Sequence, residues 1–217
     1  MLISHRYRAI FVHIQRTGGN SIRHLFNEMD ADALQEVPID AAKKRLKHCF
    51  ISDIHAAVDS ELFSGYTKFA VVRNPFDRLF SWYSMFKYNT IAKSEIAGGV
   101  VRTAALGNAV EAAVEPYLDS FESFLTMPNS GLFERFYYNQ FDYLQIDDRI
   151  AVDYVLRFEN LNNDFNALAQ TMNFPHLLPA INQSVRRQDY RAAYTQSTRQ
   201  LVADRFARDL DYFSYSF

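Results

Sequence analysis

The chain has 217 residues and 15 % aromatic residues, which fits one domain with a substantial core. Its formal net charge of −2 excludes a global positive field that would recruit nucleic acid, and its single cysteine, Cys49, excludes an internal disulfide and a cysteine-rich metal site. No signal-peptide pattern and no apolar run near the ~18 residues of a membrane span are found, so a soluble cytoplasmic protein without an integral membrane segment is expected.

The first third of the chain predicts one strand and two helices. An apolar run predicts a buried strand over residues 8–14, and helical spacing predicts a helix over 21–29. Residues 31–47 end in a basic cluster whose simplest interpretation is a solvated helix face. Ser and Asp at 52–53 can cap a helix that runs to about residue 63.

The rest of the chain continues the alternation of strands and helices. Short apolar runs predict strands over 69–72 and 153–158. Periodicity predicts helices after Pro75 and over 117–127, 132–143, 163–172 and 198–210. This alternation favours an α/β fold with a mainly parallel central sheet, in a single domain over residues 1–217.

The stretch between the first strand and the first helix is suited to an anion. Gly18 and Gly19 allow close backbone approach and positive φ, and the N–H groups at the helix start would face a negative charge. Arg16 adds a cation. The stretch lacks the Gly-Lys-Ser/Thr end of a nucleoside triphosphate loop. The alternative is an ordinary strand-to-helix turn.

A second candidate anion site follows the second strand. Arg73 ends that strand, where a guanidinium can bind a phosphate with two hydrogen bonds, and Ser81 lies eight residues further on, in the next helix. The alternative is a structural ion pair between Arg73 and Asp77 or Glu159. Two such positions on two strands of one sheet indicate a ligand with two separated phosphate groups.

These motifs resemble those of the carbohydrate sulfotransferase family, of the small bacterial type. FVHIQRTGGNSI, from Phe11 to Ile22, is similar to the family's 5′-phosphosulfate loop, above all to that of the heparan-sulfate 6-O type. FAVVRNPFDRLFSWY, from Phe69 to Tyr83, is similar to the 3′-phosphate motif VRNPxxRxxSxY. VLRFENL and the last 24 residues also resemble the family, so the likeness runs in order from about residue 9 to 217 and is weakest over 85–135.

The resemblance implies a P-loop-like, three-layer α/β domain that transfers a sulfuryl group from 3′-phosphoadenosine 5′-phosphosulfate (PAPS) and releases PAP. The acceptor would be a hydroxyl of a carbohydrate or a similar molecule, and no metal is expected. The residues implied in donor binding are Arg16, Thr17, Gly18, Gly19, Asn20 and Ser21 at the phosphosulfate, and Arg73 and Ser81 at the 3′-phosphate. Ser184, Arg186 and Arg187 in the basic loop 181–191 are further candidates, with a solvated loop as the alternative.

The chain departs from the family at the loop lysine, which is Arg16 here. Because arginine stays protonated, Arg16 is expected to stabilise charge in the transition state and not to act as an acid. The acceptor hydroxyl needs a base, and His48 is preferred over His55 because it precedes the predicted helix cap and a Lys-His pair matches the family at this point.

Two other functions stay open at this stage: a small-molecule kinase with a degenerate phosphate loop, and a non-catalytic nucleotide-binding protein. Gln140 and Glu159 are possible sugar contacts. The sequence decides neither the acceptor, nor the role of residues 85–140, nor the oligomeric state.

Overall fold

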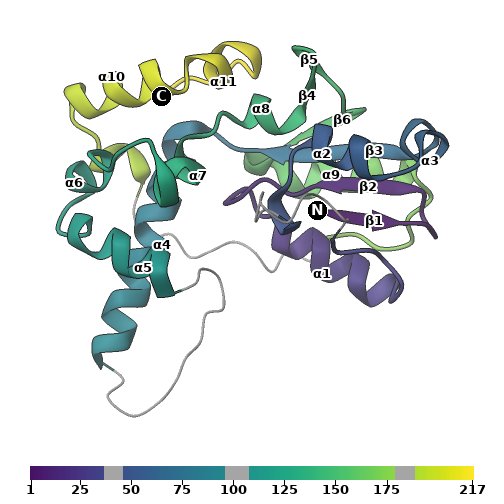
Figure 1. Cartoon of the computed structure of the whole chain (residues 1–217), viewed down its shortest axis with the longest axis horizontal. Helices are drawn as coiled ribbons and strands as arrows, with labels where there is room; N and C mark the ends of the chain where they lie inside the picture. The colour runs from purple at the N-terminus through teal and green to yellow at the C-terminus, as the bar shows by residue number, and fades with distance from the viewer. Residues whose placement is uncertain (37–45, 96–107, 179–188) are drawn as a thin grey trace. The chain divides into compact units, whose positions relative to one another are not determined.

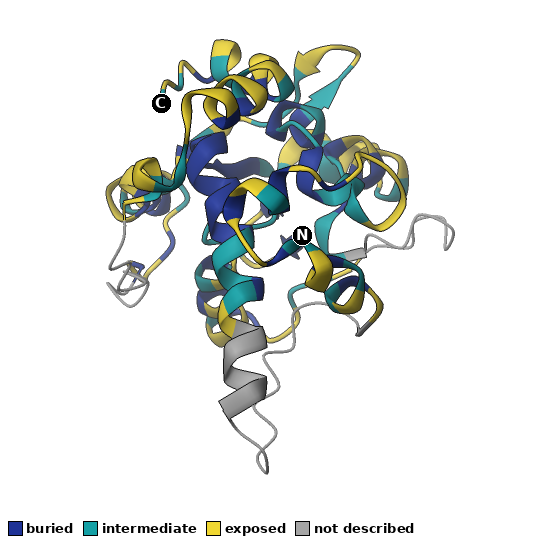
Figure 2. Ribbon diagram, turned by 90° about the vertical axis from the view of Figure 1, so that its left-hand side faces the viewer, coloured by how far each residue is buried: buried dark blue, intermediate teal, exposed yellow. Residues whose placement is uncertain are grey.

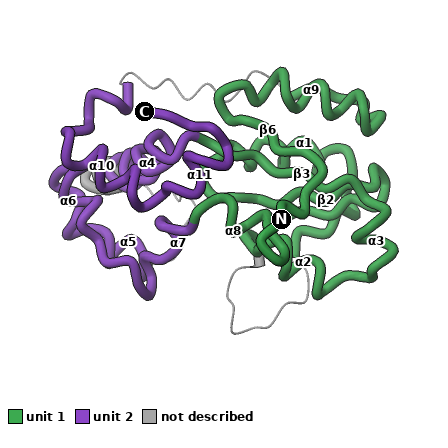
Figure 3. The backbone as a smooth tube through the Cα atoms, turned by 90° about the horizontal axis from the view of Figure 1, so that it is seen from above, with its two compact units in different colours: residues 1–73, 139–186 green, residues 74–138, 187–217 purple. Residues whose placement is uncertain are grey.

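A computed structural model describes residues 1–36, 46–95, 108–178 and 189–217 of the chain (Figure 1). Contacts divide the chain into two units, shown in green and purple in Figure 3. Unit 1 comprises Met1–Arg73 and Asn139–Arg186, and unit 2 comprises Asn74–Tyr138 and Arg187–Phe217. The single domain over residues 1–217 stays a prediction.

Unit 1 contains a four-stranded sheet. Its strands lie in the order β1 (Leu2–Ser4), β2 (Ala9–Val12), β3 (Thr67–Val72) and β6 (Tyr154–Arg157). Strands β2, β3 and β6 are parallel, and β1 is an antiparallel edge strand. The three strands predicted from apolar runs are therefore confirmed, as is a mixed α/β fold with a mainly parallel sheet. The short strand β1 was not predicted.

The apolar runs form central strands because both faces of the sheet are covered. Every residue of β2 is buried, as expected for a parallel strand with packing on both sides. Figure 2 colours the described residues by burial, with the buried ones in dark blue. Phe11 of β2 and Phe69 of β3 stack with their ring centroids 5.0 Å apart, and Phe165 of the helix that follows β6 lies 6.4 Å from the ring of Phe69. This core fixes the ends of the strands from which the candidate site residues project.

Unit 1 also contains several short helices and a two-stranded hairpin. The helices are α1 (Gly19–Met29), η2 (Leu46–His48), α2 (Ile51–Ala57), α3 (Ser60–Gly65), α8 (Gln140–Leu144), η5 (Phe158–Asn160) and α9 (Leu161–Thr171). The hairpin pairs β4 (Gln145–Ile146) with β5 (Arg149–Ile150). Its turn residues Asp147 and Asp148 both have positive φ, as a tight hairpin turn requires.

The single helix predicted over about 52–63 is wrong in one respect, since the chain forms two helices there. Helix α2 begins at Ile51, and the carboxylate of Asp53 accepts the N–H of Phe50. The chain turns extended at Val58, and Asp59 then caps α3 by accepting the N–H of Glu61. The cap at Asp59 explains the break, because it starts a new helix within the predicted one.

Unit 2 is helical among its described residues. Its helices are α4 (Pro75–Glu95), α5 (Asn108–Val114), η3 (Glu115–Tyr117), α6 (Phe121–Leu125), η4 (Gly131–Phe133), α7 (Glu134–Tyr137), η7 (Tyr190–Ala193), α10 (Gln196–Arg205) and α11 (Ala207–Tyr212). Pro75 is the first residue of α4, as predicted. The predicted helix over 198–210 is interrupted at Phe206, where α10 ends. Aromatic side chains, among them Trp82 and Phe136, form the core of this unit.

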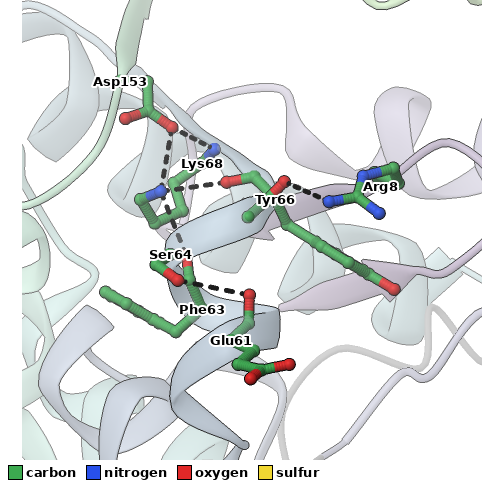
Figure 4. Close-up of polar contacts among 8 residues, drawn as sticks. Arg8, Glu61, Phe63, Ser64, Tyr66, Lys68 and Asp153 are labelled. Atoms are coloured by element: carbon green, nitrogen blue, oxygen red, sulfur yellow. Dashed lines mark hydrogen bonds and ion pairs between the residues drawn. The ribbon is translucent and has the colours of Figure 1, made fainter.

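The amino ends of β3 and β6 are joined by a buried lysine (Figure 4). The Nζ of Lys68 lies 3.0 Å from a carboxylate oxygen of Asp153 and donates to the carbonyl oxygens of Phe63, at 3.2 Å, and Tyr66, at 2.9 Å. The same carboxylate accepts the backbone N–H of Lys68. This network fixes the end of the sheet opposite to the candidate site.

Within the described ranges, no helix is long and apolar enough to cross a membrane.

Candidate functional site

The candidate site residues of unit 1 follow the carboxyl ends of the parallel strands. Residues 13–18 follow β2, Arg73 follows β3 and Phe158 follows β6. The register pairs Val12 with Ala70, and Val72 with Arg157, so the three strands end at one edge of the sheet. Ligands of open α/β sheets bind at this edge.

The loop after β2 is closed by its own hydrogen bonds. Gly18 adopts a left-handed conformation with φ +84° and caps α1, and the N–H of Ser21 donates to its carbonyl oxygen over 3.2 Å. The hydroxyl of Thr17 is buried and donates to the carbonyl oxygen of Ile14 over 2.9 Å. The hydroxyl proton of Thr17 is therefore used within the loop. The N–H groups at the start of α1 belong to a helix N-terminus, a type of position that favours an anion.

Gly19 lies against the ring of His13. A Cβ atom at Gly19 would lie 2.4 Å from Cδ2 of His13, 2.6 Å from Nε2 of His13 and 2.9 Å from Cζ of Phe11. These distances are shorter than real contacts, so the start of α1 can approach the strand only with glycine at this position. The His13 ring is stacked on Phe11, with the ring centroids 5.5 Å apart. This ring therefore limits how closely the first turn of α1 can pack against the strand.

Arg16 and Arg73 lie close together. Nη1 of Arg73 donates to the carbonyl oxygen of Arg16 over 2.8 Å, and the guanidinium of Arg73 lies 3.9 Å from the ring centroid of Phe158. The pKa of Arg16 is lowered to about 10, mainly by burial and to a lesser extent by the positive charge of Arg73. Because the half-buried Arg16 and the buried Arg73 carry like charges, an anion bound beside them would be stabilised.

The backbone of Arg73 is held by Gln140, a residue in α8. The N–H of Arg73 donates to Oε1 of Gln140, and Nε2 of Gln140 donates to the carbonyl oxygen of Arg73, both over 2.8 Å. Gln140 has an exposed fraction of 0 %. A side chain so buried does not face a sugar, so the expected sugar contact of Gln140 is replaced by a contact with the main chain of Arg73.

His48 lies in η2, beside the strand end that carries the loop. Its Nδ1 lies 2.8 Å from the carbonyl oxygen of His13, and the two imidazole rings are 4.5 Å apart. A carbonyl oxygen only accepts, so Nδ1 carries the proton and Nε2 is the acceptor nitrogen of the neutral ring. Burial lowers the pKa of His48 to about 3, and it also lowers the pKa of His13 well below its ordinary value.

The residue before His48 also reaches the start of α1. Nζ of Lys47 donates to Oδ1 of Asn20, the second residue of α1, over 3.2 Å. The structure therefore brings the segment of His48 together with the glycine-containing loop at two points, through His13 and through Asn20.

The family model described as the sulfotransferase family matches residues 1–216. The chain belongs to the sulfotransferase family. Membership supports a transferase with sulfotransferase activity in general terms, and so confirms the resemblance given by the two strand-end motifs. No curated protein and no solved structure matches this sulfotransferase significantly.

The other predicted site residues fall in unit 2, elsewhere in unit 1, or outside the described residues. Ser81 belongs to unit 2, in α4, with an exposed fraction of 1 %. His55 is exposed in the last turn of α2, and its ring centroid lies 4.5 Å from that of Phe63. Ser184, Arg186 and Arg187 lie outside the described residues.

Sequence reasoning missed two contacts that shape this site of the sulfotransferase. The carbonyl oxygen of His13 orients His48, and the amide of Gln140 fixes the backbone of Arg73. Neither leaves a periodic signal, because one partner in each pair is a main-chain group. The position of His13, directly after a buried strand and before the glycines, was the available signal for the first.

Proposed function

We propose that the protein transfers a sulfuryl group from PAPS to a hydroxyl of a carbohydrate or similar acceptor. The observation that carries this proposal is the pair of arginines, Arg16 and Arg73, in contact at the carboxyl edge of the sheet, beside a glycine-containing helix start. Membership of the sulfotransferase family supports it. In this proposal the whole chain forms one domain of P-loop-like, three-layer architecture.

The residues present fit a donor with two anionic groups. The start of α1, from Arg16 to Ser21, would hold the phosphosulfate through backbone N–H groups and the guanidinium of Arg16. Arg73, with Ser81, would hold the 3′-phosphate. Ser184, Arg186 and Arg187 are proposed to complete the donor site. The fit rests on the contact between Arg73 and Arg16 beside the start of α1, which places two guanidinium-bearing residues where the strands end.

His48 is proposed as the general base. Its protonated Nδ1 is held by the carbonyl oxygen of His13, so Nε2 is the nitrogen that would take the proton of the acceptor hydroxyl. The donor supplies the sulfuryl group: the acceptor oxygen forms a bond to sulfur, the bond from sulfur to the 5′-phosphate oxygen breaks, and PAP leaves with the electron pair. A bound anion nearby would raise the pKa of His48 from its low value and so make it a stronger base.

Arg16 is proposed to act on the leaving group. The 5′-phosphate oxygen of PAP is weakly basic and leaves without a proton, so a fixed positive charge suffices to stabilise it. Burial and the neighbouring Arg73 lower the pKa of Arg16 to about 10, which still leaves the guanidinium charged at neutral pH. The replacement of the family's lysine by arginine is therefore compatible with turnover.

A thermal-shift comparison of two ligands tests the proposal. Saturation by PAP at 100 times its Kd should stabilise the protein by about 2.7 kcal/mol, by mass action. ATP with Mg²⁺ should protect little. Protection by ATP with Mg²⁺ and none by PAP would indicate the kinase instead. Protection by PAP without sulfate transfer to any of a panel of hydroxyl acceptors would indicate a binding protein without catalysis.

Two further expectations stay predictions: that the protein requires no metal, and that it is located in the cytoplasm.

A further inference from the structure

The contact between Gln140 and Arg73 has no role in the donor site as proposed above, although it involves two buried hydrogen bonds. We propose that Gln140 is a positioning residue: it fixes the main chain of Arg73 so that the guanidinium points at the donor's phosphate. The inference rests on the proposed function, because it concerns how the PAPS site is held.

The pairing resembles the two hydrogen bonds that a residue of a β-strand makes with a residue of its partner strand. A single amide accepts the N–H of Arg73 and donates to its carbonyl oxygen, both over 2.8 Å, at the residue that directly follows β3. Arg73 and Gln140 have exposed fractions of 2 % and 0 %. Since water does not reach these groups, loss of the amide would leave a donor and an acceptor of Arg73 buried without their bonds.

The position of the Arg73 main chain affects both the guanidinium of Arg73 and the loop that contains Arg16. The guanidinium of Arg73 is held over the ring of Phe158 at 3.9 Å, and its Nη1 holds the carbonyl oxygen of Arg16 at 2.8 Å. Arg16 sits in the left-handed region with φ +65°, which a non-glycine residue adopts only when its surroundings impose it. A shift of Arg73 would therefore move the loop that carries Arg16.

Helix α8 also contacts the segment of the proposed base. Tyr143, three residues after Gln140, meets the ring of Phe50 edge-on with centroids 4.7 Å apart, and Phe50 follows His48 by two residues. One short helix of unit 1 thus lies against both the arginine that would hold the donor and the segment that carries His48.

The test compares PAP binding by calorimetry in folded variants. Gln140→Leu keeps a similar volume and removes both bonds, and it should weaken PAP binding at least tenfold, as Arg73→Ala should. Lys68→Met is the matched control, because it breaks a partly buried polar network at the other end of the same strand. It should lower the Tm and leave the Kd for PAP within twofold. A Gln140→Leu variant with the Kd of the unsubstituted protein overturns the inference.

A double-mutant cycle separates positioning from a general loss of stability. If Gln140 acts through the guanidinium of Arg73, adding Gln140→Leu to Arg73→Ala should change the Kd for PAP by less than twofold. Additive tenfold losses would overturn the inference. Should a leucine variant fail to fold, Gln140→Met removes both bonds with a flexible side chain of similar volume, and it should still weaken PAP binding at least fivefold. An unchanged Kd in that variant also overturns the inference.

The two proposals fail in different ways. Absence of PAP binding by the unsubstituted protein overturns the PAPS assignment, and the inference with it. If PAP binds tightly and substitution of Gln140 leaves its Kd unchanged, only the inference on Gln140 is overturned.

Discussion

The Nδ1–H of His48 donates to the carbonyl oxygen of His13 over 2.8 Å, which ties the candidate base to the strand end that carries the glycine-containing loop. This bond fixes one tautomer and leaves Nε2 to accept a proton. A second contact, ring edge against ring at 4.5 Å, holds the orientation of the imidazole. The base and the candidate donor loop are therefore positioned by the same residue.

Replacement of His48 tests the base. His48→Ala should lower kcat for sulfate transfer by about 10²–10⁴, the range for a lost general base, with PAP affinity changed little. His55→Ala is the matched control, since His55 is exposed and packs on Phe63. Rates measured with saturating PAPS decide between them. A large loss in His55→Ala alone would reverse the assignment, and small losses in both would place the base elsewhere.

Replacement of Arg16 tests the role of charge at the leaving group. Arg16→Ala should lower kcat by about 10²–10³, as for a lost group that stabilises transition-state charge. Arg16→Lys keeps a cation at this position, gives the residue of the family motif, and should keep substantial activity. The carbonyl oxygen that accepts from Arg73 is present in both variants, so a difference between them reports the side chain. Normal turnover by Arg16→Ala would contradict the electrostatic role.

The close approach of Gly19 to His13 predicts a steric effect. Gly19→Ala would place a methyl group 2.4 Å from the His13 ring, and such overpacking typically costs about 1–3 kcal/mol of unfolding free energy. PAP affinity should fall as well. Gly65→Ala is the control, because its methyl group meets only the end of the flexible Arg8 side chain. Denaturant unfolding should show Gly65→Ala unchanged or slightly stabilised; equal stability of the two variants would contradict the packing argument.

The buried His13 and the half-buried His48 predict a stability that falls in acid. Burial lowers the pKa of His48 from 6.5 to about 3, so between these values the unfolded chain binds a proton that the folded chain does not. This contribution is complete above pH 6.5 and is lost as the pH falls, by up to about 1.4 kcal/mol per pH unit, until the folded chain is protonated near pH 3. His13 adds a loss of the same sign. His48→Gln should therefore flatten the dependence of unfolding free energy on pH between 7 and 5, and an unchanged slope would count against the low pKa.

The elements that apolar runs specify were predictable, and those that tertiary contacts specify were not. Strands β2, β3 and β6 follow from continuous apolar runs, because both of their faces are buried. The strand β1 has three residues, too few for a periodic signal, and forms because it pairs with β2. The break at Val58 depends on the cap formed by Asp59, which competes with continuation of the helix.

The candidate site was predictable where a strand end and a motif coincide. Arg16 and Arg73 were singled out from their positions after two strands, and the structure brings them into contact. The bond of Arg73 with Gln140 was out of reach, because a side chain that bonds a main-chain group requires no particular partner residue. For the bond between His48 and His13, the position of His13 after a buried strand was the available signal. The pairing of Arg73 with Ser81 stays a prediction, since the two residues fall in different units.

The 67-residue separation of Arg73 and Gln140 has a consequence for how sequences of this type can diverge. The chain leaves unit 1 after Arg73, builds most of unit 2, and returns at Asn139, so this pair closes a loop around the intervening segment. Loop-closure entropy grows only with the logarithm of length, and doubling the loop costs about 0.6 kcal/mol. Two hydrogen bonds of about 1 kcal/mol each offset that cost. Insertions and deletions between these two residues can therefore reshape the intervening segment while the main chain of Arg73 keeps its place.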